Sequence, residues 1–252
     1  MLRKDLSKPA SVSADPDEIA RFNRLAHEWW SADGAFKTVH AFNRVRVAHL
    51  SKRLPTLLGR DPTGALPLTG LSLLDVGCGA GIATEPLSRL GATVTAIDAA
   101  ESNIRIARHH AEISGCDIDY RHLLPEQLAV EGRQFDAVVS LEVVEHVADL
   151  DVFLTALADL VKPGGLMVIG TLNRTLRSFL KAIVGAEYVL RWLPRGTHDW
   201  RRFVRPAELA AKFAPLGFAA VECEGVSISA LTRRWAMTAD DSLAYLQFHR
   251  KN

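Results

Sequence analysis

A glycine-rich turn between an apolar segment and a helical segment is the feature that most constrains the fold of this chain. Leu73–Val76 leads into Gly77, Gly79 and Gly81 at alternate positions, and Asp98 closes the next apolar segment. Glycines adopt positive φ and let the backbone approach a ligand, while the N–H groups at a helix N-terminus attract an anionic group. An acidic residue at the second strand end can accept hydrogen bonds from ribose hydroxyls. The pattern predicts a nucleoside-cofactor site.

Asp75, just before the glycines, separates two classes of cofactor. Dinucleotide folds place two residues before the third glycine, whereas here the glycines alternate strictly. A carboxylate would repel a pyrophosphate, but it suits the α-ammonium of S-adenosylmethionine. The turn therefore resembles motif I of the class I methyltransferases. A nicotinamide oxidoreductase and a tight turn without a ligand are the alternatives, although three glycines would weaken the elements for no gain.

Composition agrees with one α/β domain carrying additions. The chain has 252 residues, of which 48% are hydrophobic, and its formal net charge of +1 gives no bulk attraction for nucleic acid. Cys78, Cys116 and Cys223 form no C-x-x-C pair, which indicates reduced thiols in the cytosol. No apolar run approaches the roughly 20 residues that span a bilayer, and Asp5 argues against a transit peptide.

The organisation expected along the chain is a tail (1–14), an N-terminal helical lid (15–70) and the cofactor-binding domain (71–252). Asp15 caps a helix predicted to run to about Trp30, and Pro55 is expected to stop a second helix that begins near Val39. Apolar and helical segments then alternate, which predicts an α/β fold with a mostly parallel seven-stranded sheet and helices on both faces. Strands are expected near 71–76, 93–97, 117–121, 135–141, 166–171, 219–224 and 245–249, and helices near 82–90, 101–114, 149–161 and 206–214.

The segment after the fourth strand carries the candidate chemistry. If a helical turn begins there, Glu142, Glu145 and His146 share one face and could hold a divalent cation such as magnesium, which would lower the pKa of an attacking hydroxyl. The alternatives are a solvated helix face, or His146 acting alone as a general base. His198, beside Asp199, is a second candidate base.

Several longer segments carry a narrower resemblance. They are Phe22–Trp30, Gly34–Lys37 with His40, Asn43–Arg46, Thr171–Arg174, Val184–Leu190 and Gly196–Asp199. From Asp15 onward the chain resembles the ubiquinone biosynthesis O-methyltransferases. The resemblance implies a Rossmann-like class I methyltransferase fold and methyl transfer from S-adenosylmethionine to phenolic hydroxyls of a polyprenylated catechol-type ring, at two stages of one pathway.

The resemblance also assigns residues by position. It implies that Arg46, Gly77, Asp98 and Leu141 bind the cofactor, beside the Asp75 and Gly79 already singled out. By binding the carboxylate of the cofactor, Arg46 would close the leading helices over it. In related eukaryotic enzymes Glu142, Glu145 and His146 match metal ligands.

An insertion at 174–205, after the fifth strand, concentrates positive charge. It holds eight basic residues against two acidic ones, with apolar residues at helical spacing between them. Such a helix is typical of an anionic bilayer surface, where a polyprenyl chain resides. We expect a cytoplasmic protein peripheral to the inner membrane face, with other ubiquinone-biosynthesis proteins as further partners. A lid core or dimer contact is the alternative.

Two other function classes are disfavoured. A non-catalytic scaffold would not need Asp75, Asp98 and the Glu142–His146 set. A nucleic-acid methyltransferase would continue from Asn173 with the Pro-Pro-Tyr/Phe segment of enzymes that stack a flipped base, and Arg174 follows instead. A methyltransferase for a different small phenol or quinone remains open.

Overall fold

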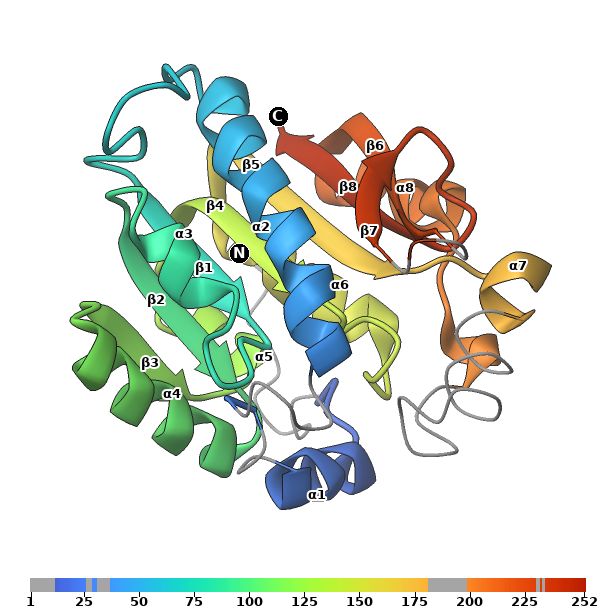
Figure 1. Cartoon of the computed structure of the whole chain (residues 1–252), viewed down its shortest axis with the longest axis horizontal. Coiled ribbons are helices and arrows are strands. Elements are labelled where there is room, and N and C mark those ends of the chain that lie inside the picture. Colours follow the sequence, from blue (N-terminus) through green and yellow to red (C-terminus); the bar gives the residue numbers. More distant parts are fainter. Residues whose placement is uncertain (1–11, 26–28, 31–36, 181–198, 230–231, 233) are drawn as a thin grey trace, which may run out of the picture.

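A computed structural model describes residues 12–25, 29–30, 37–180, 199–229, 232 and 234–252 (Figure 1). Its helices are α1 (Pro16–Leu25), α2 (Lys37–Leu57), α3 (Thr84–Ser88), α4 (Glu101–Ser114), α5 (Pro125–Val130), α6 (Leu150–Asp159), α7 (Leu176–Ser178) and α8 (Pro206–Phe213), with 3-10 turns η3 (Trp200–Arg202) and η4 (Ala214–Leu216). Its strands are β1 (Ser72–Val76), β2 (Thr93–Asp98), β3 (Ile118–His122), β4 (Phe135–Leu141), β5 (Val161–Leu172), β6 (Phe218–Ile228), β7 (Trp235–Thr238) and β8 (Ala244–Lys251).

The strands form one sheet in the order β3-β2-β1-β4-β5-β8-β6-β7. The first five are parallel, and β8 lies antiparallel between β5 and β6. The α/β class and the mostly parallel sheet are confirmed. The count of seven strands was wrong, because β7 adds an eighth as the second arm of a hairpin with β6. Its four residues are too few to show an alternating pattern in the sequence.

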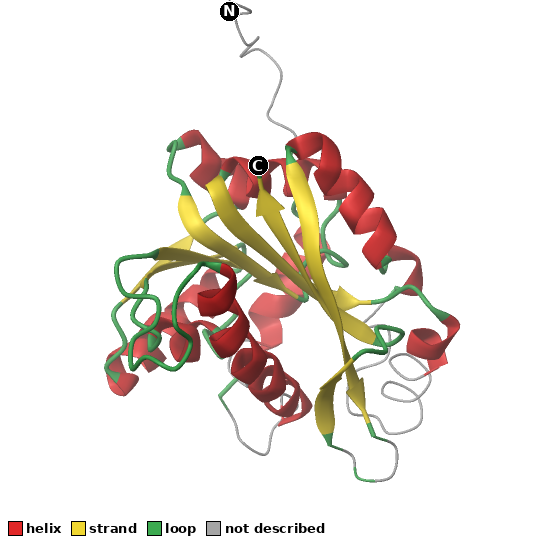
Figure 2. Cartoon of the chain, turned by 90° about the horizontal axis from the view of Figure 1, so that it is seen from above, coloured by secondary structure: helices red, strands yellow, loops and turns green. Residues whose placement is uncertain are grey.

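Alternate residues of the strands point to opposite faces of the sheet and form two core layers, as expected for a sheet covered on both faces (Figure 2). Leu73 and Val139 pack with Leu50 and Leu54 of α2 on one face. Leu74 and its same-face neighbours pack with α5, α6 and α8 on the other face. A third cluster joins α4 to the sheet beside β2 and β3. The carboxyl ends of β1, β2 and β4 stay uncovered by these layers, and α1 lies beyond them (Figure 1).

The second helix corrects two expectations. Pro55 lies inside α2 instead of stopping it. In the last turn a proline removes only one helical hydrogen bond, and the chain continues because Leu58 N donates to Leu54 O at 2.9 Å. In addition, Phe42, Leu50 and Leu54 are buried in the core. Of the two leading helices, only α1 therefore has the position of a lid.

The remaining differences concern short elements. Asp15 does cap α1, accepting from Asp17 N at 3.1 Å, but the helix ends at Leu25 and Trp29–Trp30 form a separate turn. No helix was expected at α5, whereas α7 lies in the insertion for which an amphipathic helix was expected. In the described part of the chain no helix is long and apolar enough to cross a membrane.

Candidate functional site

The glycine turn after β1 is held against the end of β2. Gly77 N and Cys78 N both donate to Ile97 O, at 2.8 and 3.1 Å. Gly77 has φ +76°, and a Cβ there would lie 2.2 Å from Val143 Cγ2, in the segment after β4. Glycine is needed at this position because the side chain of Val143 occupies the space that a Cβ would take. The glycine pattern had instead predicted a ligand close to this backbone.

Asp98 ends β2 with its carboxylate turned toward the glycine turn. Its Oδ2 accepts from Gly79 N at 2.9 Å, and its Oδ1 accepts from Ala100 N at 2.8 Å and from Asn103 Nδ2 at 3.2 Å. Burial raises the pKa of Asp98, although the two backbone N–H groups oppose this. The carboxylate is therefore in the position that ribose recognition requires in doubly wound folds.

Asp75 lies deeper than expected for a ligand-contacting carboxylate. It is buried, and its Oδ2 accepts from Thr84 Oγ1 at 2.6 Å. Burial raises the pKa of Asp75 to about 6, while the Thr84 bond opposes the shift. One oxygen thus ties the strand to α3, and the contribution of Asp75 to the site is local negative charge and turn geometry.

Arg46 reaches the carboxyl end of β4 from α2. The side chain is 2% exposed, stacks over the Phe42 ring at 3.8 Å and pairs with Glu142 Oε1 at 2.6 Å. Its other terminal nitrogen donates to Asn43 Oδ1. Its Nε is buried without a partner. A buried guanidinium with an unused donor is suited to bind the carboxylate of an amino-acid-like ligand.

Glu142 and Glu145 take different orientations. Glu142 has φ +57°, so the chain leaves β4 through a left-handed residue, and Glu142 N donates to Gly170 O at 2.8 Å. Glu145 is buried and accepts from Thr171 Oγ1 at 2.9 Å, while its Oε1 has no partner. Burial, together with the nearby Glu142 charge, raises the pKa of Glu145 to about 8.

His146 faces the N-terminal helix. Its Nδ1 lies 2.9 Å from Glu18 Oε2, and this bond holds the pKa of Glu18 below its usual value although partial burial opposes it. The side chain of His146 is 15% exposed, and it follows the end of β4 by five residues. A carboxylate bonded to one imidazole nitrogen orients the ring and defines the other nitrogen as the base.

The predicted metal centre does not fit this geometry. The expected helical turn is a tight turn in which His146 N donates to Val143 O at 2.8 Å, and the left-handed Glu142 breaks the shared face. Glu142, Glu145 and His146 instead face Arg46, Thr171 and Glu18. Within the residues described above, no group of three or more His, Cys, Asp or Glu residues could hold a metal ion.

The other predicted residues have different outcomes. Leu141 is 9% exposed, and its side chain lies against the backbone of Gly170, where a Cβ would meet Leu141 Cδ2 at 2.7 Å. It is an apolar residue at the end of β4, as expected. His198 falls outside the described residues, while Asp199 caps η3 by accepting from Arg201 N at 3.0 Å.

Sequence reasoning missed three polar residues at this edge of the sheet. Glu18 orients His146, and Asn103 connects Asp98 to Trp29, whose indole Nε1 donates to Asn103 Oδ1 at 3.0 Å. Trp29 was noted only as part of a family resemblance. Asn103 could have been predicted from its place in the first helical turn after Asp98, the carboxylate expected to bind ribose.

Together these residues lie at the edge of the sheet where the parallel strands end, and they include both a carboxylate and a buried cation. Asp98 supplies acceptors for sugar hydroxyls, and Arg46 supplies a buried cation some distance along the same edge, after β4. The imidazole of His146 lies between the sheet edge and α1. Such a set can hold a nucleoside that carries an amino-acid carboxylate and can move a proton nearby.

The comparisons with known proteins agree with this description. A family model described as a methyltransferase domain matches residues 42–223. The chain is 48% identical over 241 residues to the ubiquinone biosynthesis O-methyltransferase of Methylobacterium nodulans (96% of this chain, 97% of that protein). It is 49% identical over 251 residues to the protein of that name from Methylocella silvestris (98% and 97%).

Solved structures resemble it in fold. Magnesium protoporphyrin IX methyltransferase from Synechocystis, with bound SAM, is 16% identical with a TM-score of 0.66, covering 97% of this chain and all of that one. An N-methyltransferase from Bradyrhizobium japonicum, in complex with S-adenosyl-l-homocysteine, is 20% identical with a TM-score of 0.59, covering 93% and 97%. The site lies at the carboxyl ends of the parallel strands, and the sequence identity of 48–49% extends over nearly the whole chain. This chain therefore belongs to the ubiquinone biosynthesis O-methyltransferase family.

Proposed function

We propose that the protein transfers a methyl group from S-adenosylmethionine to a phenolic hydroxyl of polyprenylated catechol-type intermediates, at both O-methylation steps of ubiquinone biosynthesis. The observation that carries the proposal is the arrangement of Asp98, the glycine turn and buried Arg46 along one sheet edge in a member of this family. S-adenosylmethionine, when bound, supplies a methyl carbon activated by the sulfonium.

The cofactor-holding roles follow from geometry and charge. Asp98 accepts hydrogen bonds from the ribose hydroxyls, because its carboxylate already faces the turn at Gly79. Arg46 binds the methionine carboxylate through its buried guanidinium, which Glu142 and Asn43 hold in one orientation. Leu141 contributes an apolar surface beside the cofactor. Catalysis by such a site comes mainly from alignment of the two reacting atoms.

We assign the proton transfer to His146. The imidazole takes the phenolic proton, so that a phenolate oxygen attacks the methyl carbon while the carbon–sulfur bond breaks. Glu18, 2.9 Å from Nδ1, keeps the ring in one orientation. Glu142 is a positioning residue that acts through Arg46.

A methyl-transfer assay tests the function. The purified protein is incubated with methyl-labelled S-adenosylmethionine and a short-chain prenyl catechol, and we expect a labelled methyl ether. Asp98→Ala should weaken cofactor binding by about 10- to 100-fold, the value of a charged hydrogen bond. The control is Asp119→Ala, because Asp119 lies on the adjacent strand β3 and its side chain is 53% exposed. A wild-type protein that binds the cofactor but forms no ether would contradict the proposal.

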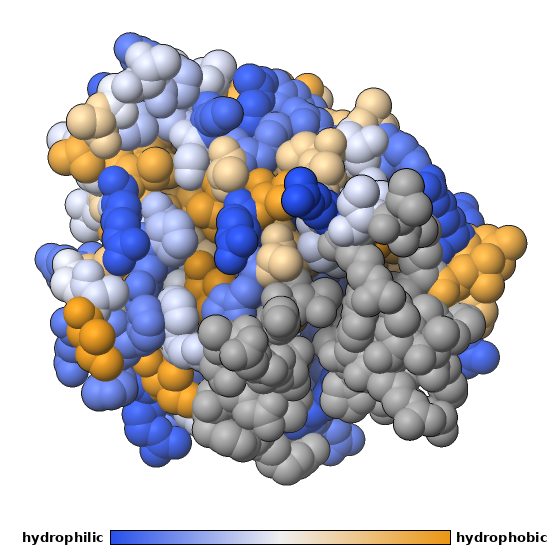
Figure 3. Space-filling view, in the orientation of Figure 1, coloured by the Kyte–Doolittle hydropathy of each residue, from blue (hydrophilic) through white to orange (hydrophobic). Residues whose placement is uncertain are grey.

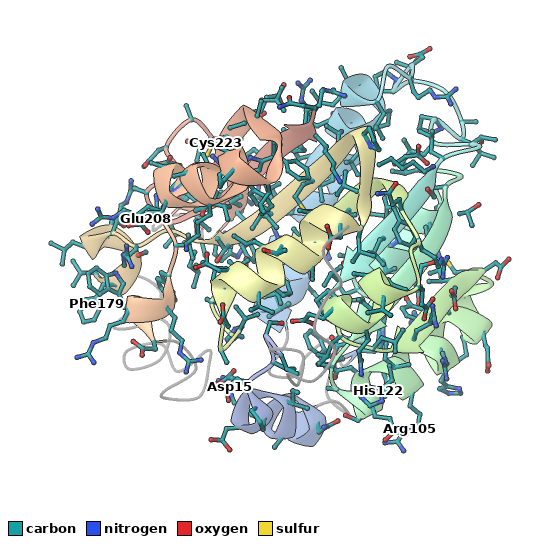
Figure 4. All side chains as sticks on the ribbon, turned by 180° about the vertical axis from the view of Figure 1, so that it is seen from behind. Asp15, Arg105, His122, Phe179, Glu208 and Cys223 are labelled. Carbon is teal, nitrogen blue, oxygen red and sulfur yellow. The ribbon has the colours of Figure 1, made fainter. Side chains whose placement is uncertain are left out.

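We also propose that the α7 region docks the enzyme on an anionic bilayer, where the polyprenyl chain of the substrate resides. Leu176, Phe179 and Leu180 are 70%, 37% and 52% exposed, an unusual exposure for three apolar side chains in five residues. Figure 3 shows an apolar patch at the place of α7, and Figure 4 shows Phe179 at the outer end of the molecule. Exposed Arg201 and Arg205 lie in the same insertion.

Vesicle sedimentation tests this docking. With phosphatidylserine-containing vesicles we expect the wild-type protein in the pellet, and the Leu176→Ser/Leu180→Ser variant in the supernatant. Val130→Ser is the matched control, because Val130 is 88% exposed but lies on α5. Binding of the double variant equal to that of wild type would contradict the proposal. On this basis the enzyme works in the cytoplasm, attached peripherally to the inner membrane face, near other ubiquinone-biosynthesis proteins.

A further inference from the structure

The first turn of α4 is joined to α1 by hydrogen bonds that complete its cap. The residue at the N-cap position, Ala100, has no side chain that can accept a hydrogen bond. Asn23 of α1 supplies the acceptor, because Ser102 N donates to Asn23 Oδ1 at 3.1 Å. Capping of an exposed helix N-terminus by a side chain contributes about 1 kcal/mol. The start of α4 is therefore more stable when α1 is docked.

Asn103, the next residue of this turn, has its amide held from both sides. It is 2% exposed, its Nδ2 donates to Asp98 Oδ1 at 3.2 Å, and its Oδ1 accepts from Trp29 Nε1 at 3.0 Å. A flipped amide would place acceptor against acceptor and donor against donor. One orientation of Asn103 thus satisfies the carboxylate and the indole at the same time.

The indole of Trp29 completes a closed ring of contacts. A Cβ at Gly79 would lie 3.2 Å from Trp29 Cζ2, so the six-membered part of the indole covers this glycine. Gly79 N in turn donates to Asp98 Oδ2 at 2.9 Å. The ring therefore runs from Asp98 to Gly79, Trp29, Asn103 and back to Asp98. Within this ring, Gly79 N holds Asp98 Oδ2 and Asn103 Nδ2 holds Asp98 Oδ1.

The adjacent Trp30 uses separate partners. Its Nε1 donates to Ala80 O at 3.0 Å, and its ring is stacked on His110 with centroids 3.4 Å apart and planes 1° apart. Trp30 thus binds the glycine turn through Ala80, whereas Trp29 binds Asn103. Trp30 offers a matched comparison for the role of Trp29.

We propose that Trp29 and Asn103 are positioning residues that couple docking of the Trp29 indole over Gly79 to occupancy of the cofactor site. With Trp29 docked, Asn103 directs its N–H at Asp98 and holds the carboxylate ready for two ribose hydroxyls, so less freedom is lost on binding. By thermodynamic reciprocity, a bound cofactor then stabilises the docked indole by the same factor. This inference rests on the proposed use of S-adenosylmethionine.

A double-mutant cycle on cofactor affinity tests the coupling. Calorimetric Kd values for S-adenosylhomocysteine are measured for wild type, Trp29→Phe, Asn103→Ala and the double variant. Phenylalanine keeps a ring over Gly79 but has no N–H. We expect each single change to raise Kd by about 5- to 30-fold, and the double change to raise it no further than the larger single effect. In the control cycle, Trp30→Phe and Asn103→Ala should combine multiplicatively.

Tryptophan emission gives a readout that does not depend on turnover. Cofactor binding should change the emission of wild type and of Trp30→Phe, and the change should be lost in Trp29→Phe. At saturating cofactor, Asn103→Ala should also show no change, because Trp29 is no longer tied to Asp98. Asn103→Asp serves if the alanine variant does not fold, since it keeps the acceptor for Trp29 and loses the donor to Asp98.

Two results would overturn the inference. One is a multiplicative cycle for Trp29 and Asn103, and the other is an unchanged emission response in saturated Asn103→Ala. Failure of the underlying function is distinguishable, because a wild-type protein that shows no calorimetric binding of S-adenosylhomocysteine would contradict the proposed cofactor before either variant is compared.

Discussion

At the scale of single residues, the site is defined by a few backbone positions with positive φ. Gly77 lets the glycine turn contact the loop after β4, and the left-handed Glu142 turns its side chain toward Arg46. Glycine adopts positive φ without strain, whereas other residues lose about 1 to 3 kcal/mol there. The strain at Glu142 lies beside the proposed cofactor site, where the Arg46 pair offsets it.

A pair of glycine substitutions tests the packing role of Gly77. Gly77→Ala should lower the free energy of unfolding by about 2 to 5 kcal/mol, because backbone strain adds to overlap with Val143. Gly132→Ala should cost about 1 kcal/mol, since φ there is +70° but nothing lies within 4 Å of an added Cβ. Urea denaturation measures both. Equal losses would show that the contact with Val143 carries no energy.

At the scale of elements, α1 and α2 have opposite characters although they are adjacent in the sequence. Four residues of α2 belong to the core, whereas the described contacts of α1 lie at the edge of the sheet. The α1 region makes three polar contacts among the described side chains: Glu18 with His146, Asn23 with Ser102, and Asp15 with Arg202. Figure 4 shows Asp15 and α1 at one edge of the molecule. Polar, half-exposed contacts of this kind allow docking and release at low cost.

Substitution of Glu18 separates catalysis from stability. Glu18→Gln should lower kcat by about 3- to 30-fold, because His146 loses its orienting carboxylate. The free energy of unfolding should change by less than about 1 kcal/mol, as for other partly exposed ion pairs. The matched control is Glu131→Gln, which removes a similarly exposed pair, with Arg121 at 2.6 Å, that does not involve His146 and should leave kcat unchanged. An unaltered kcat in Glu18→Gln would remove Glu18 from the mechanism.

At the scale of the whole molecule, the sheet is continuous from the cofactor half to the antiparallel half, and a histidine is buried in its core. His249 on β8 is fully buried, packs against Phe213 with tilted rings whose centroids are 4.6 Å apart, and has no hydrogen-bond partner on either nitrogen. Burial lowers the pKa of His249 to about 4. The folded protein therefore holds this ring neutral at pH values where the unfolded chain would protonate it.

This difference predicts how stability depends on pH. Between pH 6.5 and pH 4 the unfolded state binds the proton and the folded state does not, so stability falls as pH falls through that window. The loss attributable to His249 is up to about 3 kcal/mol. His249→Phe should flatten the stability profile between pH 4 and 6.5, and His109→Phe, on the exposed face of α4, should not. Denaturant titrations at several pH values measure this, and parallel profiles for wild type and His249→Phe would contradict it.

The sequence by itself determined the local features of this protein. The order of strands and helices, the glycine turn, the acid at the end of β2 and the family resemblance all follow from residues close together in the chain, where periodicity and turn chemistry act directly. Even there, short elements such as α5 and β7 escaped prediction, because their few residues show too little of a period.

Only the tertiary structure decided which distant residues meet. Arg46 and Glu142 are 96 positions apart, Trp29 and Asn103 are 74 apart, and Glu18 contacts His146 across the sheet edge. The same structure separated Glu142, Glu145 and His146, which spacing had placed on one face, because a single left-handed residue redirected the chain. Side-chain pairing depends on the path of the backbone through three dimensions, and one change of dihedral angle alters it without any trace in the spacing of residues.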